Sequence, residues 1–189
     1  QNYPVSDAFF THAKKRTQTK TILFLGGSLG ASAINDLALE LAASLLKKGY
    51  TLIHQSGERD FQRVSSFYQQ HQLEVTHFAF STELLTFIRE ADFAISRAGA
   101  STLFELAANQ LPTLFIPFPH AAGNHQVSNA QYLVDANAAY MIEQSELTTQ
   151  KAFNIITQSH TQLQNNLENV IKTSGTVCIS AILEARALS

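Results

Sequence analysis

Residues 21–32 read TILFLGGSLGAS, a short apolar run that passes directly into a glycine-rich turn. Residues 31–47 then carry apolar side chains at spacings of three and four, which predicts a helix with one apolar stripe. The members of the stripe are Ile34, Leu37, Ala38, Leu41 and Leu45. Gly49 can take the left-handed conformation that ends a helix, so this region predicts a strand, a turn and a helix in succession.

The same succession recurs along the chain. Six short, mostly apolar runs bounded by Gly, Pro, Ser or Asn are typical of strands that are covered on both faces. These runs are Thr21–Leu25, Thr51–Gln55, Glu74–Phe78, Phe93–Ser96, Thr113–Ile116 and Ala138–Ile142. Repeated alternation of strands and helices predicts an α/β fold, a Rossmann-like doubly wound parallel sheet of about six strands.

Further helices are expected between and after these strands. Ser81 is a suitable N-cap for a helix over Thr82–Glu90, and a short helix is expected over Asn124–Asp135. Residues 148–188 read as roughly two or three helices, with a break near residues 173–175.

Composition limits the function. Apolar residues make up 45% of the 189 residues and charged residues 15%, which allows a sizeable core. The net charge of -2 gives no general attraction to nucleic acid, so no nucleic-acid partner is expected. One basic cluster comprises Lys14, Lys15, Arg16 and Lys20, and it is expected to be a solvated segment; contact with a phosphate or an anionic surface is the alternative. Residues 1–20 are therefore expected to form an interdomain linker or leader, and residues 21–189 one domain with C-terminal helices.

The chain has features of a piece of a longer intracellular protein. Its single cysteine, Cys178, cannot form an internal disulfide, which fits a reducing compartment. No signal peptide is visible, and the longest apolar stretch, Leu111–Phe118, is too short to span a bilayer. Because the chain begins with Gln1 and its only methionine is Met141, we expect a fragment or a processed product.

The glycine turn after the first strand is the first candidate site. Glycines allow a ligand to approach the backbone closely, and the start of the following helix offers unpaired N–H groups to an anion. Gly27, Ser28 and Gly30 are therefore expected to bind a phosphate or diphosphate; a tight turn without a ligand is the alternative. A P-loop lysine is absent, and His54–Gly57 lacks the carboxylate that dinucleotide-binding folds place after the second strand.

A second glycine turn follows the fourth strand, over Ser96–Glu105. Helical residues three apart share a face and lean toward the N-terminus, so Thr102 and Glu105 are expected to point at a ligand above the helix start. The carboxylate of Glu105 suits two neighbouring hydroxyls, as on a ribose. The alternatives are a solvent-facing Glu105 and an Arg97 that forms a structural salt bridge.

The third candidate segment is Pro117–Gln126, after the fifth strand, with Asn129 one turn later. Asn124, His125, Gln126 and Asn129 crowd the start of a helix with neutral donors and acceptors, the groups that recognise sugar hydroxyls. The alternative is that Asn124 caps the helix while the other side chains are solvated.

The three segments follow strands of one parallel sheet, so we expect them to meet at one edge and to bind a single nucleotide-type ligand. The sequence has no Asp-x-Asp pair and no His/Cys cluster with metal spacing, so neither a metal nor a cofactor is expected. No catalytic residue is assigned in this chain, because a lone histidine such as His120 or His125 is more often structural.

These residues resemble the MurG family, the transferases that add N-acetylglucosamine to the undecaprenyl-diphosphate-linked muramyl peptide. The similarity covers nearly the whole chain from Thr21, in four segments: Gly26–Ala31, His54–Gly57, Ser96–Glu105 and Pro117–Gln126. The resemblance implies a GT-B glycosyltransferase, in which two Rossmann-like domains face each other across a cleft. Residues 21–189 would be its C-terminal half, the domain that binds UDP-N-acetylglucosamine.

The resemblance also implies where that donor lies. Ser28 and residues 100–102 would approach the diphosphate. Ser81 would offer its backbone to the uracil, Glu105 would bind the ribose, and Gln126 with its neighbours would bind the sugar. The substrate-binding residues expected in total are Gly27, Ser28, Gly30, Ser81, Arg97, Gly99, Ala100, Ser101, Thr102, Glu105, Asn124, His125, Gln126 and Asn129.

Two departures from the family matter. Its interdomain segment reads Gly-Asn-Pro-Val-Arg, whereas Asn2–Ser6 carries Ser6 in place of the arginine. The family's N-terminal domain is missing; it is implied to hold the lipid I acceptor, the membrane-facing patch and the general base. The resemblance therefore implies an inverting enzyme of peptidoglycan synthesis at the inner face of the plasma membrane. This half alone would bind the donor but transfer little or nothing.

Three alternatives stay open. A nicotinamide-dependent oxidoreductase would bind NAD(P), although the missing carboxylate after the second strand speaks against it. A donor-binding subunit of a two-chain N-acetylglucosaminyltransferase would dock with a separate membrane partner. A UDP-sugar epimerase would need its own catalytic residues, and none can be named here.

Overall fold

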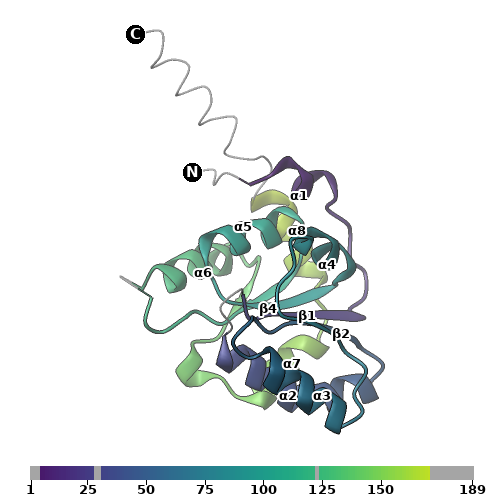
Figure 1. The fold of residues 1–189 in the computed structure, drawn as a ribbon. Helices are drawn as coiled ribbons and strands as arrows, with labels where there is room; N and C mark the ends of the chain where they lie inside the picture. The colour runs from purple at the N-terminus through teal and green to yellow at the C-terminus, as the bar shows by residue number, and fades with distance from the viewer. Residues whose placement is uncertain (1–4, 28–30, 122–123, 171–189) are drawn as a thin grey trace, which may run out of the picture.

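The computed structural model describes residues 5–27, 31–121 and 124–170. At its centre lies a six-stranded parallel sheet in the order β3-β2-β1-β4-β5-β6 (Figure 1). The strands are β1 (Thr21–Leu25), β2 (Thr51–Gln55), β3 (Thr76–Phe78), β4 (Phe93–Ser96), β5 (Thr113–Phe115) and β6 (Tyr140–Met141). The predicted α/β class, with its doubly wound parallel sheet, is confirmed.

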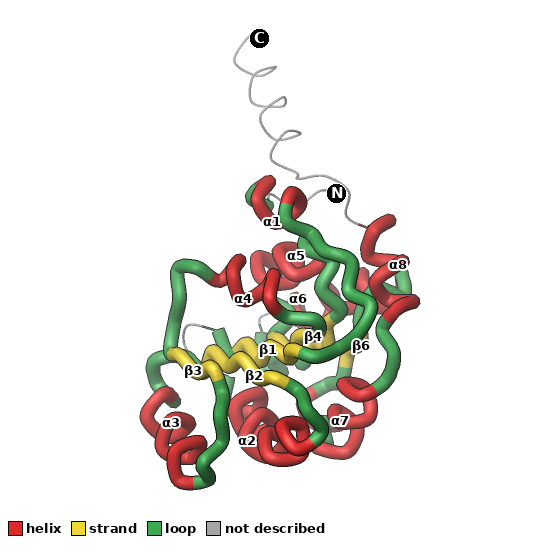
Figure 2. The backbone as a smooth tube through the Cα atoms, turned by 90° about the vertical axis from the view of Figure 1, so that its right-hand side faces the viewer, coloured by secondary structure: helices red, strands yellow, loops and turns green. Residues whose placement is uncertain are grey.

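Helices cover both faces of the sheet, as the two views at right angles show (Figures 1 and 2). On one face lie α2 (Ser32–Lys47), α3 (Phe61–Gln70) and α7 (Thr149–Thr157). On the other lie α1 (Asp7–Thr11), α4 (Leu84–Glu90), α5 (Ala100–Ala108), α6 (His125–Asp135) and α8 (Thr161–Val170). A short 3-10 turn, η2 (Gln144–Glu146), precedes α7.

Alternate side chains of each central strand enter two separate cores. Phe24 and Ile95 pack with the buried stripe of α2, whereas Leu23 and Ala94 pack under α4, α5 and α6. Because both faces are buried, these strands read as continuous apolar runs rather than as alternating patterns. The five stripe residues expected on α2 are all buried.

Most differences from the sequence predictions lie at the ends of elements. The helix expected from Thr82 begins at Leu84, and the Ser81 hydroxyl accepts from the Glu83 backbone N–H at 3.0 Å. Ser81 therefore closes a turn before α4 and is not its N-cap. Helix α3 was not identified from the sequence, because its buried side is narrow: only Val64 and Tyr68 are buried. The helices and the break expected beyond residue 170 lie outside the described residues.

The segment before β1 packs against the domain. Helix α1 begins after Ser6, whose hydroxyl accepts from the backbone N–H of Ala8 at 3.4 Å. Arg16 is only 7% exposed, so the prediction of a solvated basic cluster is wrong for this residue.

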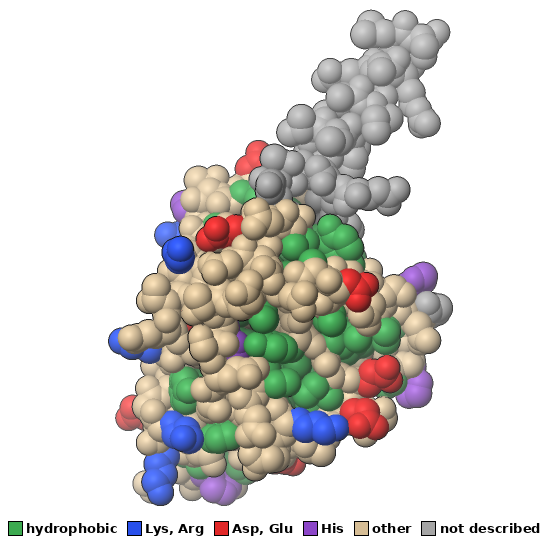
Figure 3. Space-filling view, turned by 180° about the vertical axis from the view of Figure 1, so that it is seen from behind, with side chains coloured by type: hydrophobic (Ala, Val, Ile, Leu, Met, Phe, Trp, Pro, Cys, Tyr) green, Lys and Arg blue, Asp and Glu red, His purple; other side chains and the backbone are tan. Residues whose placement is uncertain are grey.

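On the face seen from behind, Lys, Arg, Asp and Glu side chains are scattered among uncharged ones, with hydrophobic side chains across the middle (Figure 3). None of the described helices is long and apolar enough to cross a membrane.

Several helices end with the same backbone geometry but with different residues. At the end of α2, the Tyr50 N–H donates to the Leu45 carbonyl and Gly49 has a φ of 86°. The ends of α3, α5 and α6 repeat this pattern with non-glycine residues in the left-handed region: Gln72 (φ 52°), Gln110 (φ 56°) and Asn137 (φ 50°). An L-residue other than glycine is strained there, so these helix ends lack the glycine signal that marks α2.

Replacing Gln72, which is exposed, tests this geometry. We expect Gln72→Gly to raise the free energy of unfolding by about 0.5–1 kcal/mol, because glycine adopts positive φ without strain. The matched control is Gln69→Gly, within α3, which should lower it by about 1 kcal/mol. Urea denaturation measures both, and a destabilised Gln72→Gly protein would contradict the left-handed conformation.

Candidate functional site

The carboxyl ends of the central strands lie side by side. In the strand registers, Leu25 pairs with both Gln55 and Ser96, and Ser96 pairs with Phe115. After β1 the chain turns to α2 on one face, and after β4 it turns to α5 on the other face (Figure 1). The point between β1 and β4 is therefore the topological switch point, where open α/β sheets bind their ligands.

Two adjoining cavities open at this point. The first, of about 240 Å³, is lined among others by Gly27, Gln55, Phe80, Arg97, Gly99 and Thr102. The second, of about 550 Å³, is lined among others by Gly26, Ser32, Arg59, Arg97, His120 and Gln126. Arg97 belongs to both linings. The structure thus brings residues of all three predicted segments to one edge of the sheet.

Two side chains expected to bind a sugar hold the loops together. The Gln126 side-chain oxygen accepts from the backbone N–H groups of Ala98, at 3.2 Å, and Phe118, at 2.9 Å. The Asn129 amide donates to the Ala98 carbonyl at 3.0 Å. The loops after β4 and β5 are therefore joined through α6, and Gln126 also belongs to the lining of the second cavity.

Arg97 is also a bridge between loops. Its guanidinium donates to the carbonyls of Ile116 and Pro117 and to the Gln144 side-chain oxygen, at 3.0, 3.1 and 2.8 Å. It also lies 5.4 Å from the centre of the Phe118 ring. Its partners are carbonyl oxygens and a ring rather than the carboxylate of a salt bridge, and burial lowers its pKa.

The start of α5 faces the first cavity with Gly99 and Thr102. Ser101 is exposed, and its hydroxyl donates to the Glu105 carboxylate at 3.0 Å, one helical turn away. Glu105 is half-buried, so it is not fully solvated, and it belongs to neither cavity lining. Ala100 begins the helix itself.

The remaining predicted residues are placed less centrally. Asn124 and His125 are exposed at the start of α6, and Asn124 has a φ of 54° with no side-chain hydrogen bond to the helix. Asn124 therefore occupies the N-cap position of α6, as the alternative expected, but its side chain makes no capping hydrogen bond. Ser81 follows Phe80, whose side chain lines the first cavity. Ser28 and Gly30 lie outside the described residues.

A buried polar network under the glycine turn was missed by the sequence reading. Asn35 of α2 donates to the Ser56 carbonyl at 3.0 Å and to Asp60 at 2.7 Å, while its oxygen bonds His54 at 3.0 Å. The other His54 nitrogen bonds the Tyr68 hydroxyl at 2.8 Å. Since the Asn35 oxygen is an acceptor, His54 carries its proton on Nε2 and accepts from Tyr68. The only signal in the sequence is a polar pair, His54-Gln55, at the end of an otherwise apolar strand.

This network abuts Gly26. A β-carbon at that position would lie 2.8 Å from the Asn35 side-chain oxygen and 3.0 Å from the Gln55 carbonyl. At Gly99, by contrast, a β-carbon would meet nothing within 4 Å, and φ is -63°. Packing therefore requires glycine at position 26. At Gly99 the missing side chain only leaves open space beside the first cavity.

Alanine at these two glycines tests the difference. We expect Gly26→Ala to lower the free energy of unfolding by about 1–3 kcal/mol, because Asn35 and the turn must shift. Gly99→Ala should leave stability within about 0.5 kcal/mol of the unaltered chain. Thermal and urea unfolding measure both; equal stability of the two variants would refute the close approach at Gly26.

Stability should also depend on pH through His54. Burial, aided by nearby His77, lowers the pKa of His54 from 6.5 to about 3. Between these values the unfolded chain binds the proton and the folded chain does not. The contribution of His54 to the free energy of unfolding is therefore complete above pH 6.5. Below that pH it falls by about 1.4 kcal/mol for each pH unit, until pH 3 is reached.

Urea unfolding at pH 7 and pH 5 measures this loss. Between these two pH values, the free energy of unfolding of His54→Gln should fall by about 2 kcal/mol less than that of the unaltered chain. The buried His160 also has a lowered pKa and contributes equally to both proteins, whereas the half-buried His77 is coupled to His54 and adds a smaller change of its own. Replacing exposed His71 by Gln is the control; an unchanged pH dependence in His54→Gln would contradict the assignment.

Among the described residues, no group of three or more His, Cys, Asp or Glu side chains is placed to hold a metal ion. The strand order and the cavities at the switch point define a Rossmann-like α/β domain whose candidate ligand site is built from backbone, amide and arginine groups. The chain belongs to the glycosyltransferase family 28 C-terminal domain family, which matches residues 21–180.

Relatives and a solved structure agree with this assignment. A protein of Sulfurovum sp. named UDP-N-acetylglucosamine--N-acetylmuramyl-(pentapeptide) pyrophosphoryl-undecaprenol N-acetylglucosamine transferase is 42% identical over 187 residues, which are 99% of this chain and 55% of the relative. A protein of the same name from Wolinella succinogenes is 45% identical over 172 residues, 91% of this chain and 51% of the relative. The crystal structure of Acinetobacter baumannii MurG is 28% identical with a TM-score of 0.70, covering 88% of this chain and 49% of that one.

The predicted family and fold are thus confirmed, and the chain spans about half the length of these relatives. The matches give no support to the oxidoreductase or the epimerase.

Proposed function

We propose that this chain is the UDP-N-acetylglucosamine-binding half of an N-acetylglucosaminyltransferase that acts on a lipid-linked muramyl pentapeptide. The observation that carries the proposal is the pair of cavities at the switch point of a family 28 C-terminal domain, with the glycine turns of β1 and β4 on either side of them. The names of the relatives supply the donor and the acceptor.

The first cavity suits the nucleoside diphosphate. Gly99 presents no side chain, and the first N–H groups of α5 are free to bind an anion beside Thr102. Glu105, one turn further along α5, would bind the ribose of a nucleotide whose diphosphate lies at the helix start. The apolar side chains of Phe80 and Leu84 also line this cavity and would offer a surface to the uracil.

The second cavity suits the sugar. With the Gln126 oxygen engaged by two backbone N–H groups, its NH₂ group remains a donor with fixed orientation. His120 and Ser32 lie in the same lining and add further polar groups for hydroxyls. The exposed Asn124 and His125 would contact the sugar only after a local rearrangement.

The chemistry proposed is displacement at the anomeric carbon with inversion. The start of α5 stabilises the charge that develops on the leaving UDP, while a base deprotonates the acceptor hydroxyl. We assign no catalytic base to this chain and place it, with the lipid acceptor, in the remaining half of the full-length protein. The whole enzyme would then work at the inner face of the plasma membrane in peptidoglycan synthesis, and so serve cell shape and division.

Isothermal titration of the 189-residue chain with UDP and UDP-N-acetylglucosamine tests the proposal. We expect saturable binding, and about tenfold weaker binding by Gly99→Ala, whose added methyl group enters the first cavity without disturbing the fold. Absence of binding at millimolar UDP would overturn the proposed function.

The role of Glu105 is tested with a matched pair of ligands. Glu105→Gln should weaken binding of UDP by about tenfold, because it loses charged hydrogen bonds to the ribose hydroxyls. The same substitution should leave the affinity for 2′,3′-dideoxy-UDP unchanged. An equal loss for both nucleotides would show that Glu105 does not bind the ribose.

A further inference from the structure

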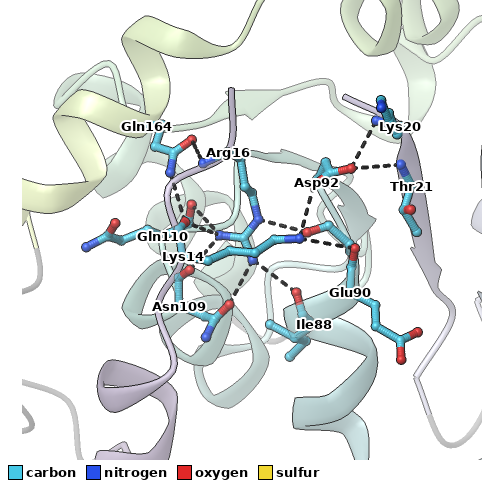
Figure 4. Close-up of polar contacts among 11 residues, drawn as sticks. Lys14, Arg16, Lys20, Thr21, Ile88, Glu90, Asp92, Asn109, Gln110 and Gln164 are labelled. Atoms are coloured by element: carbon cyan, nitrogen blue, oxygen red, sulfur yellow. Dashed lines mark hydrogen bonds and ion pairs between the residues drawn. The ribbon is translucent and has the colours of Figure 1, made fainter. Parts of the chain in front are cut away.

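One side chain outside the cavities holds the far ends of two helices that form them. The guanidinium of Arg16 donates to the carbonyls of Ile88 and Ala91 at the end of α4, at 3.0 and 2.8 Å (Figure 4). It also donates to the carbonyls of Asn109 and Gln110 at the end of α5, at 2.8 and 3.1 Å. A further bond joins it to the Asn109 side-chain oxygen at 2.8 Å.

The Arg16 guanidinium stabilises the two helix ends in two ways. The last carbonyls of a helix have no partner within it, and they carry the negative end of the helix dipole. A single buried cation satisfies both helices at once, and only the planar guanidinium offers enough donors in a fixed geometry. The carboxylate of Asp92 is engaged with Lys14 and with the backbone N–H groups of Lys20 and Thr21 (Figure 4).

The other ends of the same helices line the first cavity. Leu84 begins α4, and Gly99 and Thr102 lie at the start of α5. A helix is a rigid rod, and the nine residues of α5 span roughly 13 Å. A shift of the carboxyl end is therefore passed to the amino end, where the diphosphate is proposed to bind.

We propose that Arg16 is a positioning residue for the nucleotide site: it sets the relative placement of α4 and α5, and thereby the width of the cavity between Leu84 and Thr102. This inference rests on the proposed function, since it concerns the binding of UDP in that cavity. Arg16 itself does not touch the nucleotide.

The test compares Arg16→Met with Lys14→Met in the full chain. Both remove one positive charge from the same segment, but Lys14 is a partly exposed partner of Asp92 and the Glu90 carbonyl and makes no bond to α5. We expect UDP affinity to fall about fivefold to twentyfold in Arg16→Met and less than twofold in Lys14→Met. Hydrogen exchange should rise at the amides near residues 84 and 102 in Arg16→Met, with α2 unchanged.

Two further variants separate positioning from simple loss of stability. Gln69→Gly destabilises α3 and is expected to bind UDP like the unaltered chain. Arg16→Lys keeps the charge, but one ammonium group cannot bond the ends of both helices, so this variant should also weaken UDP binding. If Arg16→Met does not fold, Arg16→Lys is measured in its place. Unchanged affinity in a folded Arg16 variant would overturn the inference and leave the proposed function standing. Failure of the unaltered chain to bind UDP would overturn both.

Discussion

The contact between Gly26 and Asn35 fixes the geometry of the candidate site. The Asn35 side chain occupies the space next to Gly26, and it simultaneously bonds the chain after β2 through the Ser56 carbonyl and Asp60. Behind it, His54 and Tyr68 complete a network in which every donor faces an acceptor. Such a network is rigid only when all its members are paired, so the turns after β1 and β2 are held in one arrangement.

The polar side chains around the cavities serve largely to hold loops in place. Gln126 and Asn129 bind the backbone of Ala98, and Arg97 binds the backbone after β5. The groups that would recognise a ligand are then the backbone N–H groups and the few donors that these bonds leave over. A site of this kind is arranged before the ligand arrives, which lowers the cost of ordering on binding.

The layers of the fold follow from the apolar runs and from the stripe on α2, and these could be predicted. The ends of most elements could not. Gly49 marks the end of α2, but α3, α5 and α6 end at Gln72, Gln110 and Asn137, which carry no such signal. Tertiary packing imposes the left-handed backbone there.

The location of the site was predictable, because strand ends of a parallel sheet meet at one edge. The partners of individual side chains were not. Gln126 was expected to face a sugar, yet half of its amide is bound to two backbone N–H groups. Arg16 was expected in solvent, yet it is buried among carbonyls from segments more than seventy positions away in the sequence. Contacts over such separations leave no local pattern to read.

The packing around Arg16 also shows where this folding unit begins. The family match starts at residue 21, but the side chain that satisfies the ends of α4 and α5 comes from five residues earlier, and the Asn109 amide donates to the carbonyls of Phe9 and His12. A domain trimmed at the boundary of sequence similarity would expose those carbonyls and the apolar surface beneath α1. Helix α1 and the segment up to Arg16 therefore pack as part of the same folded unit as the residues that the family model matches.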